Sequence, residues 1–131
     1  MQAIVTQVTQ GIKITVKAVY EPLHSRPYQS YFVFSYNIAI ENKSDVTIKL
    51  LRRHWHIFDT LAGWHEVEGE GVISMQPVMH PSEEYQYESF CPLMSEAGKM
   101  HGTYLMENKK DGSTFLVNIP LFELIVPYRS N

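Results

Sequence analysis

Cysteine is nearly absent from this 131-residue sequence, and the single residue Cys91 cannot form an internal disulfide. Long apolar runs are also missing: none approaches the roughly 18 residues that a membrane-spanning helix requires. The first ten residues, MQAIVTQVTQ, have neither the basic flank nor the unbroken apolar stretch of a signal peptide. These absences predict a cytoplasmic protein that neither crosses a membrane nor depends on disulfides.

Positive charge is scarce as well. The formal net charge is -3, the pI is about 6.0, and charged residues make up only 19% of the chain. A nucleic-acid-binding surface normally needs a basic field, because attraction to phosphates supplies nearly all non-specific affinity. We therefore expect no direct binding to DNA or RNA.

Helical periodicity is lacking as well. No window keeps apolar residues at i, i+3, i+4 and i+7 beyond about ten residues, and only residues 93–98 are predicted to form a short helical turn. Apolar and polar residues instead alternate at 12–20 and 30–41, which is typical of strands, and 46–60 is predicted to be a third long strand. Shorter strands are predicted at 64–67, 72–76, 84–91, 102–107, 114–119 and 122–126.

Turns rich in glycine and proline separate these segments, and the polar stretch 42–45 is predicted to close a hairpin. Many short strands at intervals of about 8 to 12 residues predict an all-β fold, an antiparallel β-sandwich with an immunoglobulin-like or fibronectin type III-like outline. Residues 1–131 are predicted to form one domain, with short tails at about 1–3 and 128–131.

Aromatic residues are abundant, with eight Tyr, six Phe and two Trp. This excess over the needs of one small core predicts a protein-interaction surface. The predicted contact residues are Arg53, Trp55, Trp64, Tyr85 and Tyr87. A sheet edge offers a further route to a partner strand or to a homo-oligomer. The alternative is that Trp55 belongs to the core and that Arg53 pairs with a carboxylate.

His54 and His56 lie two positions apart on a predicted strand, so that both rings share one face of the sheet. Such a pair predicts a divalent-metal site if a third ligand comes near, and His65, His80 or His101 would be candidates. The alternative is a pair of half-exposed histidines on a polar face.

Gly69 and Gly71 begin a stretch close to the G-x-G-x-x-G pattern of dinucleotide-binding loops, but Ser74 replaces the third glycine and no helix follows. The stretch predicts either a plain loop with unusual backbone angles or a nest of amides that binds a pyrophosphate-bearing molecule such as a nucleotide. Glu66, Glu68 and Glu70 would repel such an anion.

No catalytic group can be assembled from the sequence. The serines lack a G-x-S-x-G elbow, and Cys91 is interpreted as a small apolar residue. We predict a non-enzymatic binding module that needs no cofactor.

Several short motifs make the chain similar to the bacterial ApaG family over residues 12–127. They are Arg-His-Trp at 53–55, Gly-Glu-Gly-Val at 69–72, Gln-Pro at 76–77 and Pro-x-Glu at 81–83. Isolated matching residues follow at Tyr85, Tyr87, Ser89, Gly98, Met100, Gly102, Tyr104, Met106, Phe115, Ile119, Pro120, Phe122 and Leu124.

The resemblance implies a fibronectin type III-like sandwich. It also implies a possible pyrophosphate role for Gly69 and Gly71, with Ser74 standing where the family usually has its last glycine. Similar domains in an F-box protein and in a protein that interacts with a DNA polymerase are taken to bind partner proteins. The bacterial family is associated with cobalt tolerance and magnesium efflux, without an established mechanism.

Overall fold

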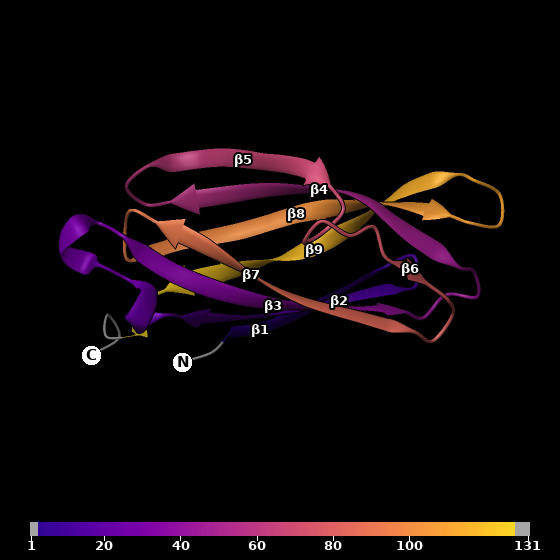
Figure 1. Ribbon diagram of the computed structural model, residues 1–131, viewed down its shortest axis with the longest axis horizontal. Helices are drawn as coiled ribbons and strands as arrows, with labels where there is room; N and C mark the ends of the chain where they lie inside the picture. Colours follow the sequence, from indigo (N-terminus) through magenta and orange to yellow (C-terminus); the bar gives the residue numbers. More distant parts are fainter. Residues whose placement is uncertain (1–2, 128–131) are drawn as a thin grey trace.

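Strands account for most of the computed structural model, which describes residues 3–127 (Figure 1). The strands are β1 Ala3–Thr9, β2 Ile12–Tyr20, β3 Phe32–Asn42, β4 Ile48–Asp59, β5 Gly63–Glu70, β6 Val78–Met79, β7 Glu84–Leu93, β8 Ala97–Asn108 and β9 Thr114–Ile125. Two single turns of 3-10 helix, η1 Pro22–His24 and η2 Pro27–Gln29, connect β2 to β3. No helix in the described range is long and apolar enough to span a membrane.

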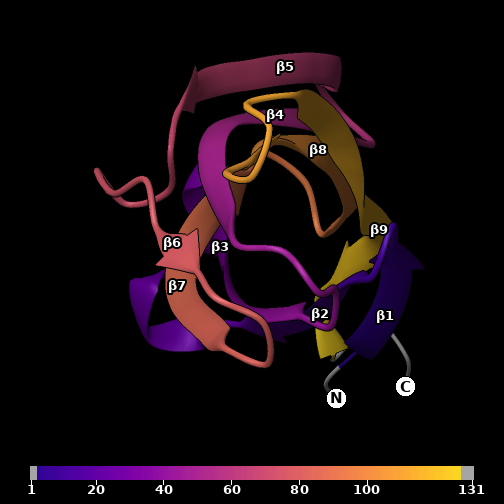
Figure 2. The ribbon, with the colours of Figure 1, turned by 90° about the vertical axis from the view of Figure 1, so that its right-hand side faces the viewer.

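Two antiparallel sheets form the sandwich. One has the order β1-β2-β3-β7, and the other has the order β5-β4-β8-β9, with the short β6 also paired to β4. The view along the strands in Figure 2 shows the two layers facing each other. The layers meet where β1 runs beside β9, and there the amide of Asn118 donates to Thr9 Oγ1 at 3.2 Å.

The core lies between the sheets, because alternate residues of most strands point inward, whereas β5 has no fully buried residue. On β2, for example, Ile12, Ile14 and Val16 are fully buried. At the centre, the Trp55 ring lies 5.4 Å from that of Tyr36 and 5.9 Å from that of Phe122, which joins the two sheets. The prediction of an all-β antiparallel sandwich is confirmed.

The prediction of a hairpin at 42–45 is wrong. β3 and β4 belong to different sheets, so this segment carries the chain from one layer to the other. The buried Asn42 side chain holds the crossing, since its amide donates to the carbonyls of Val46 at 2.8 Å and Met79 at 3.0 Å. A polar turn looks the same in sequence whether the next strand pairs with the last one or enters the opposite sheet.

Three local predictions also need correction. Residues 3–9, which the pattern did not mark, form β1 and complete the first sheet. Residues 72–76 are no strand: Val72 and Met75 form an isolated bridge around a tight turn. Residues 93–98 are not helical, because they turn from β7 into β8. Of the predicted tails at about 1–3 and 128–131, residues 1–2 and 128–131 lie outside the described residues, and Ala3 begins β1.

Candidate functional site

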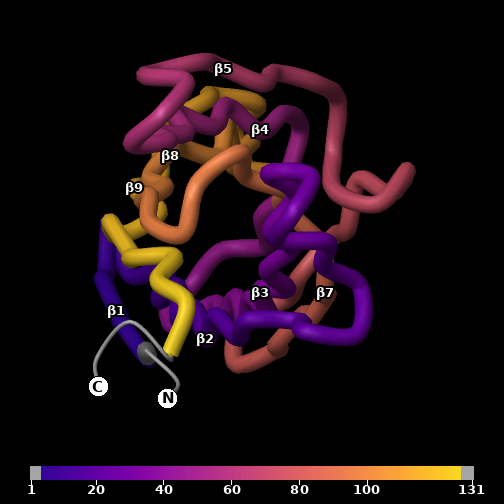
Figure 3. The backbone as a smooth tube through the Cα atoms, turned by 90° about the vertical axis from the view of Figure 1, so that its left-hand side faces the viewer, coloured from indigo at the N-terminus to yellow at the C-terminus, as the bar shows by residue number. Residues whose placement is uncertain are grey.

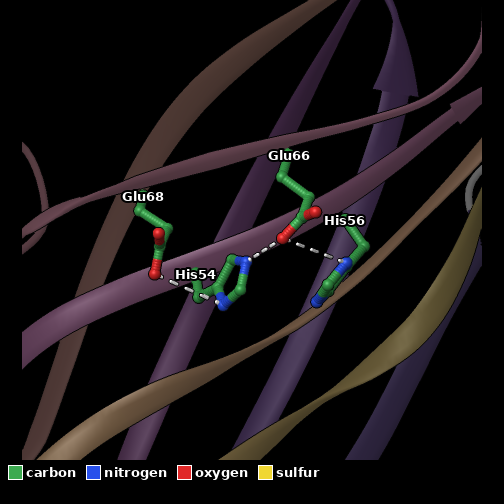
Figure 4. Close-up of polar contacts among 4 residues, drawn as sticks. All are labelled: His54, His56, Glu66 and Glu68. Atoms are coloured by element: carbon green, nitrogen blue, oxygen red, sulfur yellow. Dashed lines mark hydrogen bonds and ion pairs between the residues drawn. The ribbon is translucent and has the colours of Figure 1, made fainter.

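A cluster of histidines and glutamates lies on the outer surface of the five-stranded sheet (Figure 4). We call it the histidine face and define it as His54 and His56 on β4, Glu66 and Glu68 on β5, and His101 on β8. The strand period places both β4 histidines outward, because the intervening Trp55 is buried in the core. The predicted sharing of one sheet face by the two rings is confirmed.

Strand register brings the remaining members to this face. His54 lies opposite Glu68, and His56 lies opposite Glu66 on β5 and His101 on β8. Directly opposed residues on adjacent antiparallel strands have neighbouring side chains. The face is therefore produced by the pairing of three strands.

The carboxylates contact the imidazoles closely. His54 Nε2 lies 2.6 Å from Glu66 Oε1, and the same oxygen is 3.9 Å from His56 Nδ1. Glu68 Oε1 lies 3.5 Å from the other nitrogen of His54, Nδ1. In Figure 4 the His54 ring lies between the two carboxylates.

Aromatic contacts extend the face toward the start of β5. The His56 and His101 rings are stacked, with centroids 4.9 Å apart and an interplanar angle of 13°. Trp64 meets His101 edge-on at 5.7 Å. Partial burial lowers the pKa of His101, and the neighbouring His56 and Lys99 lower it further. A hollow of about 290 Å³ opens beside these rings.

Trp64 is the exposed aromatic residue of this region. It is 54% exposed and lies on β5, with its ring 5.1 Å from that of Phe58. The Lys99 ammonium is 5.5 Å from the Phe58 centroid and 5.7 Å from the Trp64 centroid, within cation–π range. Trp64 therefore has the exposure that a contact residue needs, and its role as a contact stays a prediction.

Trp55 and Tyr87 do not have that exposure, and their prediction as surface contacts is wrong. Trp55 is 2% exposed and Tyr87 is 9% exposed. Tyr87 shares a hydroxyl–hydroxyl hydrogen bond with the buried Tyr104, and burial raises its pKa well above the ordinary value. Tyr85 is half-buried against the core. Composition counts aromatics but does not show which face a second sheet covers.

Arg53 fixes the glycine-rich segment. Its Nη1 donates to the carbonyl of Glu70 at 2.9 Å and to that of Gly71 at 3.1 Å. A Cβ at Gly69 would lie 2.8 Å from the same guanidinium, so glycine leaves the space that Arg53 occupies. Arg53 therefore bonds backbone carbonyls rather than the carboxylate of the alternative interpretation, and its role as a contact residue stays a prediction.

The segment after β5 is a tight turn that projects from the sandwich (Figures 2 and 3). Gly71 has φ +58°, and Ile73 and Ser74 also have positive φ, which matches a two-residue type I′ turn. The amides of Val72 and Met75 donate to each other's carbonyls, and the Gly71 amide donates to Leu51. These three amides are already paired within the protein, which does not favour an anion-binding nest; the pyrophosphate site stays an untested prediction.

Sequence reasoning identified His54 and His56 but treated Glu66 and Glu68 only as charges that would repel an anion. The signal that would have found them is their spacing: Glu66 and Glu68 lie two positions apart, as the two histidines do, so paired strands would set them opposite each other.

Cys91 is buried, and this burial, together with a smaller effect of the Asp59 charge, raises the pKa of the thiol to about 12. This environment matches the interpretation of Cys91 as a small apolar residue.

The fold defines the protein as an immunoglobulin-like or fibronectin type III-like β-sandwich, with an imidazole–carboxylate cluster on the outer surface of one sheet. The family model for the ApaG domain matches residues 22–108, and the chain belongs to the ApaG family.

The chain is 44% identical to Protein ApaG of Paramagnetospirillum magneticum over 123 residues, which is 94% of each chain. It is 42% identical to Protein ApaG of Brucella abortus over 120 residues, 92% of each chain. A crystal structure of the putative ApaA protein from Bordetella pertussis superposes with a TM-score of 0.85 at 36% identity, covering 88% of this chain and 94% of that one. These matches confirm the family resemblance.

Proposed function

We propose that the protein is a non-enzymatic, cytoplasmic binding module that accepts an extended, basic segment of a partner protein along strand β5. The observation that carries the proposal is the exposure of this edge strand on both of its faces. Residues 64–68 of β5 are all exposed. An edge strand with free backbone groups is a template for strand addition.

β5 lies at the edge of its sheet, and among residues 3–127 only β4 pairs with it. Figure 3 shows β5 at the outer edge of the molecule, at the top of the view. Of the two edge strands of the other sheet, β1 runs beside β9, and β7 differs from β5 because part of its length is buried, as at Tyr87 and Leu93. The exposed Trp64 on β5 supplies the aromatic anchor that interface hot spots commonly contain.

The charges of β5 select the partner. Glu66, Glu68 and Glu70 alternate along the strand and share one face. An added strand would set every second side chain opposite one of these carboxylates, so lysine or arginine at alternate positions fits best. Pairing of β5 with β5 of a second copy would bring like charges together, which favours a basic partner over a homo-oligomer.

Binding to a synthetic peptide tests the proposal. The peptide is as long as β5 and alternates Lys with Thr; a peptide alternating Glu with Thr is the control, and a chelator is present throughout. We expect saturable binding of the Lys peptide and no binding of the Glu peptide. At low salt, Glu68→Lys should weaken the affinity for the Lys peptide at least about tenfold, since charge reversal opposes a close ion pair. Glu88→Lys on the β7 edge should change affinity little.

Amide hydrogen exchange should show new protection in β5 when the Lys peptide binds, because added strands form backbone hydrogen bonds. Protection in β7 instead, or equal binding of the Glu peptide, would contradict the proposal.

A further inference from the structure

We propose that His54, His56 and Glu66 bind one divalent transition-metal ion on the outer surface of the sheet, with Glu68 positioning His54. This inference is independent of strand addition at the β5 edge. One ligand atom from each of these three residues lies within 4.8 Å of the others. Figure 4 shows the side chains converging from two adjacent strands.

The spacing is close to that of a coordination sphere. Bonds of about 2.0 to 2.1 Å at tetrahedral angles place two ligand atoms about 3.3 Å apart. Glu66 Oε1 lies 2.6 Å from His54 Nε2 and 3.9 Å from His56 Nδ1. Small side-chain rotations that lengthen the first distance and shorten the second bring all three atoms around one ion, which would replace the His54–Glu66 hydrogen bond.

Glu68 supports this arrangement from the far side of the His54 ring. Its Oε1 lies 3.5 Å from His54 Nδ1, while Nε2 faces Glu66. Metal-binding histidines commonly donate their second ring N–H to a carboxylate, which fixes the ring orientation and makes the ligating nitrogen more basic. Glu68 is therefore a positioning residue rather than a ligand.

His101 restricts the second histidine. Its ring is stacked on His56 and limits the rotation of that ring within the face. Beside the pair lies the hollow of about 290 Å³, lined by His56, Trp64, His65, Glu66 and His101. Two of the three proposed ligands, His56 and Glu66, line this hollow, which leaves room for water or an exogenous ligand at a further coordination position.

The donor set also selects the class of ion. Two imidazole nitrogens and one carboxylate suit Zn²⁺ and related first-row metals, whereas Mg²⁺ and Ca²⁺ prefer sites made of oxygen atoms. His54 and His56 have side-chain exposures of 32% and 36%, so ions reach them from solvent. The site should bind Zn²⁺ and discriminate against Mg²⁺.

Calorimetric titration of the chelator-treated protein with Zn²⁺ tests the proposal, with Mg²⁺ as the competing ion. We expect one Zn²⁺ per chain and no displacement by Mg²⁺. His54→Ala and the isosteric Glu66→Gln should each weaken Zn²⁺ affinity at least about tenfold, since each removes a ligand. Glu68→Gln should weaken it about tenfold through loss of positioning.

The matched control is His80→Ala. His80 is an exposed histidine bonded to Thr47 Oγ1 at 3.0 Å and is not part of the histidine face, so its removal should leave Zn²⁺ affinity unchanged. Each variant should unfold at the wild-type temperature without metal, which excludes loss of fold as the cause. Absence of a one-to-one Zn²⁺ complex, unchanged affinity in Glu66→Gln, or equal losses in His80→Ala and His54→Ala would overturn the proposal.

Discussion

Substitution of Gly71 tests the close approach between the backbone at Gly71 and the carbonyl of Met75 in the turn after β5. The φ of Gly71 is +58°, and a Cβ built there would lie 1.9 Å from the carbonyl oxygen of Met75. Gly112 is the matched control: its φ is +75°, but nothing lies within 4 Å of its Cβ position. Alanine at both sites incurs the left-handed backbone cost of about 1 to 2 kcal/mol, partly offset by lower entropy of the unfolded chain.

Only Gly71→Ala adds a steric conflict with backbone. The Met75 carbonyl accepts the Val72 amide at 2.8 Å, so moving it breaks that bond and weakens the return bond from Met75 to Val72 at 2.9 Å. Each such bond contributes about 1 kcal/mol net. Val72, which is fully buried, also loses packing. We therefore expect Gly71→Ala to lower the free energy of unfolding by about 3 kcal/mol and Gly112→Ala by about 1 kcal/mol or less.

Thermal and urea unfolding followed by circular dichroism measure this difference. A chain of this size loses roughly 3 to 4 °C of Tm per kcal/mol, so Gly71→Ala should lower Tm by about 10 °C. The urea m-value should stay unchanged if only stability is altered. Equal stability of Gly71→Ala and Gly112→Ala would contradict the close approach of the two backbone segments. Because a larger side chain at Gly71 destabilises the fold, loss of anion binding in such a variant would not by itself identify Gly71 as part of an anion site.

Three further predictions concern buried groups. Asp59→Asn should reduce stability at neutral pH, because the Asp59 carboxylate accepts hydrogen bonds from the amides of Leu61 and Met94 and from the Ser95 hydroxyl. Burial raises the pKa of Asp59, but these hydrogen bonds outweigh burial and lower the pKa below its ordinary value. The stability difference between wild type and variant, measured by urea unfolding, should therefore shrink as the pH falls below about 4 and through the folded-state pKa. Cys91 should react with a thiol reagent at neutral pH only as fast as the protein opens, and rapid labelling under native conditions would contradict its pKa of about 12. Trp55→Ala should cost about 3 to 5 kcal/mol in urea unfolding, whereas Trp64→Ala should cost far less; similar losses would mean that burial is misassigned.

The outer position of β5 links the two proposals. The strand supplies Glu66 and Glu68 to the histidine face and also carries the free edge. An ion held by His54, His56 and Glu66 would neutralise part of the negative charge that attracts a basic segment. The peptide experiment therefore uses a chelator, and repeating it with Zn²⁺ would show whether the metal and the segment compete.

Local patterns predicted much of the strand content. The alternation at 12–20 coincides with β2, and the predicted strands at 30–41 and 46–60 lie within two residues of β3 and β4 at each end. Residues with positive φ were harder to predict. Residues 72–76 were predicted to form a strand because Val72 and Ile73 favour strands, but Ile73 has φ +46° and lies in a tight turn. There the paired hydrogen bonds between Val72 and Met75 close a turn whose backbone angles a β-branched side chain disfavours.

The candidate site divides in the same way. The strand period placed His54 and His56 on one face from the sequence alone, since successive side chains of a strand alternate. The period did not say whether that face or the face of Trp55 was covered by the second sheet. It also did not show that β5 would bring Glu66 to the histidines.

By itself, the sequence determined the all-β class, the two-residue periodicity of each strand and the family to which the chain belongs. These depend on residue order over short distances, where side-chain alternation and turn chemistry act. Tertiary structure alone decided that β3 and β4 lie in different sheets, that Trp55 is buried, and that imidazoles and carboxylates meet across three strands. Those outcomes depend on strand pairing and on burial between layers, which join residues far apart in the chain and leave no local pattern.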